Sequence, residues 1–212
     1  MFIELIDLLR CVNSHDDTWL VASFKSITNR FVEEGTLGCP SCSAEYWIRG
    51  GVADFSAETV VELFEEERRH ASHRREELAT RVGAYLNATE PGASIVLGGV
   101  WAYAAQELSA LAQVRILALN ADTEVKESET VGLLSVGDKI PVAPGSLLGV
   151  ALDAWFPAKI VESAVRAVRP GGRVVGPASM PPPAELSVLA HDDRYWVAEK
   201  APEVITLSRA SR

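Results

Sequence analysis

A closely spaced pair of cysteines constrains this chain more than any other feature of its sequence. Cys39 and Cys42 form a C-P-S-C turn, and Cys11 and His15 precede them near the start of the chain. A C-x2-C turn directs two thiolates toward one point, where they serve either a tetrahedral metal or a redox pair. Three thiolates and one imidazole would complete a closed zinc site, which is structural because it leaves no position open for chemistry.

Composition narrows the class of protein. The chain has 212 residues, of which 48% are hydrophobic and 23% charged, as in an ordinary globular protein. A net charge of −9 offers no basic face to a polyphosphate strand, so autonomous nucleic-acid binding is disfavoured. No apolar run approaches the roughly 20 residues that a bilayer needs, and the first ten residues do not have the pattern of a signal peptide. We therefore expect a cytoplasmic protein, whose reduced thiols favour metal over disulfide.

The residues around the cysteines predict a small module over 1–56. Apolar residues at helical spacing predict one helix over 2–10. Residues rich in β-formers predict short strands over 19–22, 45–49 and 52–55, and the polar residues 29–35 predict a turn. A unit this small buries little apolar surface, so we expect a metal staple or a docking partner.

Residues 1–56 also resemble the zinc-ribbon family of activator subunits of tRNA and protein methyltransferases. The resemblance is carried by LIDLLRC, by the C-P-x-C turn, and by the tail of Tyr46, Ile48 and Gly51. It implies a zinc ion held by Cys11, Cys39, Cys42 and, by position, either His15 or Asp16. The alternatives are that the metal has been lost, with Cys11 a buried small hydrophobe, or that the C-x-x-C turn is a redox pair.

The same resemblance implies a protein partner. In that family the activator pairs with its enzyme through a strand edge, and the candidate edge strands here are 19–22 and 46–49. Trp19 and Trp47 are the tryptophans expected where the ribbon meets another surface. The ribbon would dock on the rest of its own chain, on another protein, or on a second copy in a homodimer.

The remaining residues, 57–212, predict strands that alternate with helices. The expected strands are 95–97, 114–119, 147–152 and 173–176, with 195–198 and 204–207 as a closing antiparallel pair. The expected helices are 58–88, 101–112 and 157–168. His70 and His73 lie in the first helix on what we expect to be a solvated charged face. This alternation predicts an α/β fold with a doubly wound parallel sheet and a ligand crevice at the carboxyl ends of its strands.

The stretch IPVAPGSLLGVALD, followed after a helix by VRPGGRVV, resembles the Rossmann-like family of S-adenosylmethionine-dependent methyltransferases. The resemblance implies that Gly98 and Gly99 form the first cofactor loop and that Asn120 or Asp122 follows the second strand near the cofactor's ribose. It also places Asp153 at the end of the fourth strand, in a catalytic or cofactor-facing position. The alternative for Asp153 is a cap for the next helix.

Three departures from the family pattern concern the cofactor site. Val96 replaces the acid of the first loop, Val100 stands at its second glycine, and Asn120 replaces the ribose-binding acid. The branched Val100 and the following Trp101 are expected to crowd the pocket. We therefore predict a non-catalytic or weakly catalytic pseudo-methyltransferase that acts as a binding or scaffold protein. The alternative is an active S-adenosylmethionine-dependent methyltransferase with a built-in activator module.

Overall fold

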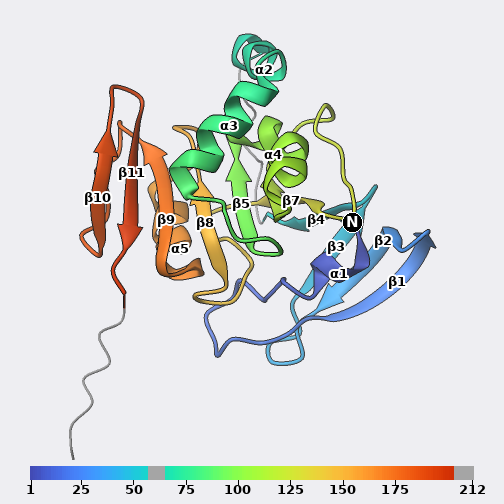
Figure 1. Cartoon of the computed structure of the whole chain (residues 1–212). Helices are drawn as coiled ribbons and strands as arrows, with labels where there is room; N and C mark the ends of the chain where they lie inside the picture. The colour runs from blue at the N-terminus through green and yellow to red at the C-terminus, as the bar shows by residue number, and fades with distance from the viewer. Residues whose placement is uncertain (57–64, 203–212) are drawn as a thin grey trace, which may run out of the picture.

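The computed structural model describes residues 1–56 and 65–202, and their strands form one mixed sheet of eleven strands (Figure 1). The strand order is β1-β2-β3-β4-β7-β6-β5-β8-β9-β11-β10. The N-terminal elements are α1 (Ile3–Ile6), β1 (Val21–Thr28), β2 (Phe31–Gly38), β3 (Glu45–Arg49) and β4 (Val52–Phe55). The following elements are α2 (Glu65–Ser72), α3 (Arg75–Leu86), β5 (Ser94–Gly98), the 3-10 helix η1 (Gly99–Ala104), α4 (Ala105–Ala112), β6 (Arg115–Leu119), β7 (Val131–Val136), β8 (Leu147–Ala151), α5 (Ala158–Ala167), β9 (Val168–Pro177), β10 (Leu186–His191) and β11 (Tyr195–Lys200).

The N-terminal elements differ from the sequence prediction in two places. The helix predicted over 2–10 is only the single turn α1, because the chain leaves it to form bridges from Leu9 to Val142 and from Arg10 to Trp19. The polar residues 29–35 are mostly strand. Only Asn29 and Arg30 turn, both with positive φ, and they connect β1 to β2.

Parallel strands make up the centre of the sheet. β4, β7, β6, β5, β8 and β9 run parallel in that spatial order, and β11 and β10 follow antiparallel. The chain passes from β5 outward through β6 and β7, then returns to place β8 on the other side of β5. The order of the strands therefore reverses between β5 and β8, where doubly wound sheets hold their ligands. The predicted α/β class with a Rossmann-like, doubly wound parallel sheet is confirmed.

Helices cover both faces of this sheet, and alternate residues of each strand enter opposite cores (Figure 1). In β5, Ile95 and Leu97 pack beneath α3 and α4, whereas Val96 packs on the face covered by α5. The core on the α5 face, which contains Val96, also contains Leu5, Ile48 and other apolar residues of the N-terminal module. None of the described helices is long and apolar enough to cross a lipid bilayer.

The N-terminal module joins the rest of the chain through β4. β4 pairs parallel with β7, with Val52 opposite Leu133 and Phe55 opposite Val136. Within the chain the docking strand is thus β4 and neither 19–22 nor 46–49, because β3 has neighbours on both sides and β1 forms the outer edge of the sheet. The backbone N–H of Arg10 also donates to the carbonyl of Pro141 (2.8 Å). The sheet and the core on its α5 face therefore include residues of both the N-terminal module and the larger part.

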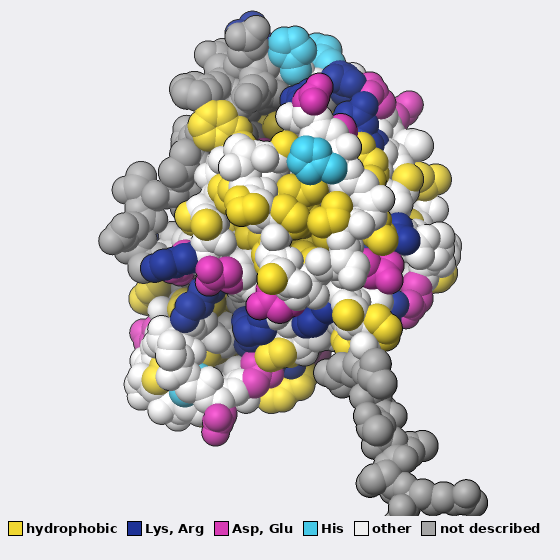
Figure 2. Space-filling model, turned by 90° about the vertical axis from the view of Figure 1, so that its left-hand side faces the viewer, with side chains coloured by type: hydrophobic (Ala, Val, Ile, Leu, Met, Phe, Trp, Pro, Cys, Tyr) yellow, Lys and Arg dark blue, Asp and Glu magenta, His cyan; other side chains and the backbone are white. Residues whose placement is uncertain are grey.

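Three further differences concern the second part. The described portion of the helix predicted over 58–88 is broken between α2 and α3, where Arg74 leaves the helical region at φ −122° and ψ 27°. Strands β7 and β10 were not predicted. β11 pairs with β9 and β10, and the predicted partner segment 204–207 lies outside the described residues. Figure 2 looks onto the β10 edge, where hydrophobic side chains gather and Val188 and Leu189 are half exposed.

Candidate metal centre and cofactor crevice

The fold brings Cys11, His15, Cys39 and Cys42 together into one cluster. Their ligand atoms all lie within 4.8 Å of one another. Cys39 directly follows β2 and is buried, and Cys42 lies in the following turn, where the N–H of Ser43 donates to the carbonyl of Cys39. Cys11 and His15 come from the segment between α1 and β1. The side chain of Asp16 does not belong to this group of the described residues.

The distances within the cluster fit a tetrahedral zinc ion. The Sγ atoms of Cys11 and Cys42 are 3.7 Å apart, and the Sγ of Cys39 is 3.4 Å from the Nε2 of His15. A tetrahedral zinc with bonds of about 2.3 Å to sulfur and about 2.0 Å to nitrogen separates two sulfurs by about 3.8 Å and a sulfur and a nitrogen by about 3.5 Å. The donor set and its geometry are therefore compatible with a structural zinc site.

Surrounding polar groups orient these four side chains. The Nδ1 of His15 lies 2.7 Å from the carbonyl of Asp16, which leaves the Nε2 lone pair for a metal. The phenol of Tyr46 accepts from the N–H of Val12 (3.3 Å) and lies 3.1 Å from the Sγ of Cys11. Hydrogen bonds from the backbone of Ala44 and the amide of Asn13 lower the pKa of the Cys42 thiol to about 6. A metal ligand must be a thiolate, and Cys42 is one at neutral pH.

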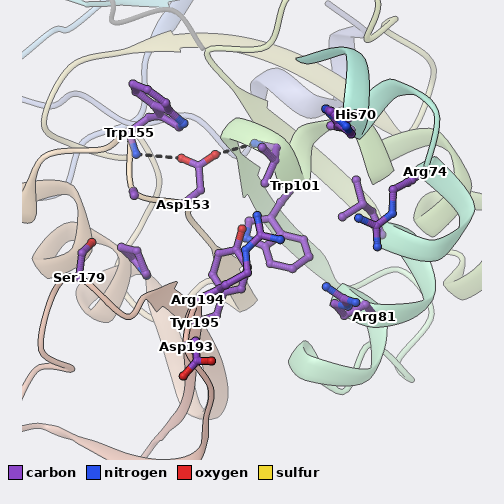
Figure 3. Close-up of a pocket in the computed structure, with 15 residues that line it drawn as sticks. His70, Arg74, Arg81, Trp101, Asp153, Trp155, Ser179, Asp193, Arg194 and Tyr195 are labelled. Carbon is purple, nitrogen blue, oxygen red and sulfur yellow. Dashed lines mark hydrogen bonds between the residues drawn. The ribbon is translucent and has the colours of Figure 1, made fainter. Parts of the chain in front are cut away.

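The second candidate site lies at the reversal point of the sheet, where Asp153 closes over the first loop. Gly99 has φ +64°, and a Cβ there would overlap the carboxylate of Asp153. That carboxylate accepts from the N–H of Val100 (2.7 Å) and the N–H of Trp155 (3.1 Å), and Asp153 is only 3% exposed (Figure 3). Asp153 thus caps the turn after β8. The predicted cap of the next helix was wrong, because α5 begins after Pro157 without a side-chain cap.

An aromatic ring fills the space beside Gly98. A Cβ at this position would lie 2.6 Å from the ring of Phe156, which is buried. The glycines that resemble a cofactor loop therefore make room for two side chains of the β8–α5 segment, Asp153 and Phe156. The sequence had predicted crowding by Val100 and Trp101. The side chains that lie against these glycines are instead those of Asp153 and Phe156. Phe156 carried no signal in the sequence, because its contact with Gly98 is formed only by the tertiary fold.

The predicted ribose-binding residues are held by the chain itself. The side-chain amide of Asn120 donates to the carbonyl of Val136 (3.0 Å) and accepts from its N–H (2.8 Å). The carboxylate of Asp122 accepts from the hydroxyl of Tyr103 and from the N–H of Glu124. Asn120 therefore ties β6 to the end of β7, and Asp122 is turned toward η1. Neither residue lines the crevice described next.

A crevice of about 750 Å³ opens on the other side of Asp153, toward α2, α3 and β11 (Figure 3). Its wall includes Trp101 after β5, Asp153 and Trp155 after β8, and Arg194 and Tyr195 at the start of β11. Such a volume is typical of small-molecule sites. Two further wall residues, His70 and Val100, had been singled out in the sequence. The others had not: Ala71, Arg74, Leu78, Arg81, Ala154, Pro177, Ser179 and Asp193.

Asp153→Ala is expected to lower the free energy of unfolding by about 2 kcal/mol, because it leaves the N–H groups of Val100 and Trp155 without their acceptor. Urea unfolding followed by circular dichroism measures this loss. Asp153→Asn keeps one side-chain carbonyl oxygen and is expected to lose about half as much. An Asp153→Ala protein as stable as the unmodified chain would show that the carboxylate is not needed to hold the loop.

No family model and no curated protein sequence matches this chain. It is similar in structure to a candidate sarcosine dimethylglycine methyltransferase from Galdieria sulphuraria, at 20% identity and a TM-score of 0.41 over 56% of this chain and 54% of that one. It is also similar to the MycE methyltransferase of mycinamycin biosynthesis, at 11% identity and a TM-score of 0.46 over 63% of this chain and 48% of that one. A third similar structure is the complex of the Haloferax volcanii Trm112 methyltransferase activator with a candidate methyltransferase, at 19% identity and a TM-score of 0.39 over 54% of this chain and 59% of that one. The matched region is thus about half the length of these structures, which are described as methyltransferases or as a methyltransferase bound to its activator.

Proposed function

We propose that this chain is a pseudo-methyltransferase: a methyltransferase-type sheet fused to an activator-type zinc ribbon, acting as a binding or scaffold protein without methyl transfer. The observation that carries this proposal is the plugged first loop. Asp153 and Phe156 occupy the space beside Gly99 and Gly98 that a cofactor would need. An adenosyl group would have to displace a buried carboxylate that already accepts two backbone hydrogen bonds.

The ribbon supplies the structural and partner-binding part of this function. Its zinc ion would be held by Cys11, His15, Cys39 and Cys42 and would take no part in chemistry, since four protein ligands close the coordination shell. In the cytoplasm, where thiols stay reduced, these cysteines remain available to the metal. Trp19 and Trp47 are 62% and 46% exposed, and arginines lie over both rings, Arg10 over Trp19 and Arg49 over Trp47. We place the contact with another protein, or with a second copy of the chain, on this surface of the ribbon.

Titration with S-adenosylmethionine tests the proposal. Isothermal calorimetry on the zinc-loaded protein is expected to show a dissociation constant weaker than about 1 mM, which corresponds to less than about 4 kcal/mol of binding free energy. The physical reason is the cost of moving the Asp153 carboxylate and the Phe156 ring out of the loop.

Micromolar binding of S-adenosylmethionine would overturn the proposal and favour the alternative, an active methyltransferase with a built-in activator. In that case Asp153→Asn should change the affinity, because the residue would face the cofactor. Arg49→Gln is the matched control, since Arg49 lies on the exposed side of β3 beside Trp47, away from the crevice.

A further inference from the structure

The crevice beside Asp153 has a chemical character that differs from the rest of the molecule. Three guanidinium groups, from Arg74, Arg81 and Arg194, line it together with the imidazole of His70, against the carboxylates of Asp153 and Asp193. The whole chain carries a net charge of −9. Arginine is therefore concentrated at this site, where two aspartates and the neighbouring Glu77 balance much of its charge.

The three arginines are not equally neutralised. Glu77 lies within ion-pair distance of both Arg74 and Arg81 (3.2 Å to Arg81), so one carboxylate is shared between two cations. Among the side chains that the structure describes, those of residues 1–56 and 69–202, no carboxylate lies within ion-pair distance of Arg194, whose guanidinium lies 5.8 Å from the ring of Tyr195. Arg194 is thus the cation at this crevice with the greatest capacity to bind an added carboxylate.

An aromatic surface forms another part of the wall. The rings of Trp101 and Tyr195 are 4.8 Å apart and tilted by 55°, and Trp155 lies across the crevice from them (Figure 3). Trp101 is fully buried, yet its indole Nε1 has no hydrogen-bond partner in the described part of the chain. An indole N–H is only a donor, so the group that would satisfy it is an acceptor oxygen. Buried donors are nearly always paired in native proteins.

We propose that this crevice binds a small organic anion with a flat apolar body, of the class of aromatic carboxylates. The arginines would hold the carboxylate, Arg194 foremost, while the apolar body packs against the ring of Trp155. The proposed ligand does not enter the loop at Gly98 and Gly99, so its binding leaves Asp153 and Phe156 in place. No bond is made or broken in this step.

Titration with 1-naphthoate, followed by calorimetry and by quenching of tryptophan fluorescence, tests the proposal on the full chain. We expect saturable binding to one site per chain. The neutral isostere naphthalene-1-carboxamide is expected to bind at least about tenfold more weakly, because it cannot form a charge-assisted bond with a guanidinium. Arg194→Gln should weaken naphthoate binding by about tenfold or more and leave the affinity for the amide unchanged.

Arg49→Gln is the matched control, because it removes one positive charge from the exposed ribbon surface without touching the crevice. Equal affinity for the acid and the amide, unchanged naphthoate binding by a folded Arg194→Gln protein, or no saturable binding would each overturn the proposal. The test is separate from the titration with S-adenosylmethionine. Tight binding of that cofactor would defeat the pseudo-methyltransferase proposal, whereas the naphthoate comparison concerns only the arginines and rings of the crevice.

Discussion

Cys39→Ser is expected to abolish zinc retention and to lower the melting temperature of the whole chain by roughly 10–20 °C. Cys39 is buried, and its Sγ lies beside the Nε2 of His15 in the cluster. Structural zinc contributes about 10–16 kcal/mol of folding free energy in zinc-finger peptides. A loss of only about 5 kcal/mol from a chain of this length would give a shift of this size. Metal analysis of the purified protein and differential scanning calorimetry measure the two effects.

Two further variants separate the candidates for the fourth ligand. His15→Ala should lose zinc, whereas Asp16→Asn should keep it, because only the backbone carbonyl of Asp16 contacts the His15 ring. A chelator added to the unmodified chain should reproduce the thermal shift of Cys39→Ser and have no effect on that variant. Zinc that stays bound in Cys39→Ser would show that the ligand assignment is wrong, and a purified chain without zinc would favour loss of the metal.

Phe55→Ala should lower the free energy of unfolding by about 3–5 kcal/mol, as expected for loss of a large aromatic side chain from a core. Phe55 ends the docking strand β4, is buried, and stacks on Tyr46 with ring centroids 4.5 Å apart. Its core also contains Leu134 and Val136 of β7. Urea unfolding followed by circular dichroism should therefore show a single transition at a lower midpoint.

Phe55→Leu is the conservative partner and should cost less than about 1.5 kcal/mol, because most of the buried volume is kept. Trp47→Ala, on the exposed side of the neighbouring strand, should leave stability nearly unchanged. Two separate unfolding transitions, of which Phe55→Ala moves only the smaller, would contradict a core shared by the ribbon and the larger part.

The cluster of Cys and His side chains could be predicted from the sequence, because thiols and imidazoles at short spacing are typical of metal ligands. The alternation of apolar runs and helices likewise predicted the parallel sheet. Strand β7 was missed because VGLLSV mixes glycine and serine with its apolar residues and has no strict alternation. Strand β10 was missed because it is an edge strand whose side chains are almost all exposed, so it has no buried face to leave a pattern.

The closure of the first loop could not have been predicted in its details. Val96, Val100 and Asn120 indicated a departure from the family pattern, but the residues that lie against Gly98 and Gly99 come more than fifty positions further along the chain. The sequence of Gly98 and Gly99 does not indicate whether they face a ligand or a buried side chain. Only the packing of β8 beside β5 decides between the two, and it places Phe156 and Asp153 there.

The pairing of β4 with β7 has a consequence for competition. β7 has β6 on one side and β4 on the other, so a strand of another chain would reach its backbone only by first displacing β4. Because β4 belongs to the same chain as β7, its effective concentration at β7 is in the millimolar range. Unlike a separate subunit, β4 does not dissociate when the protein is diluted. A strand from another chain should therefore compete poorly with β4 for the edge of β7.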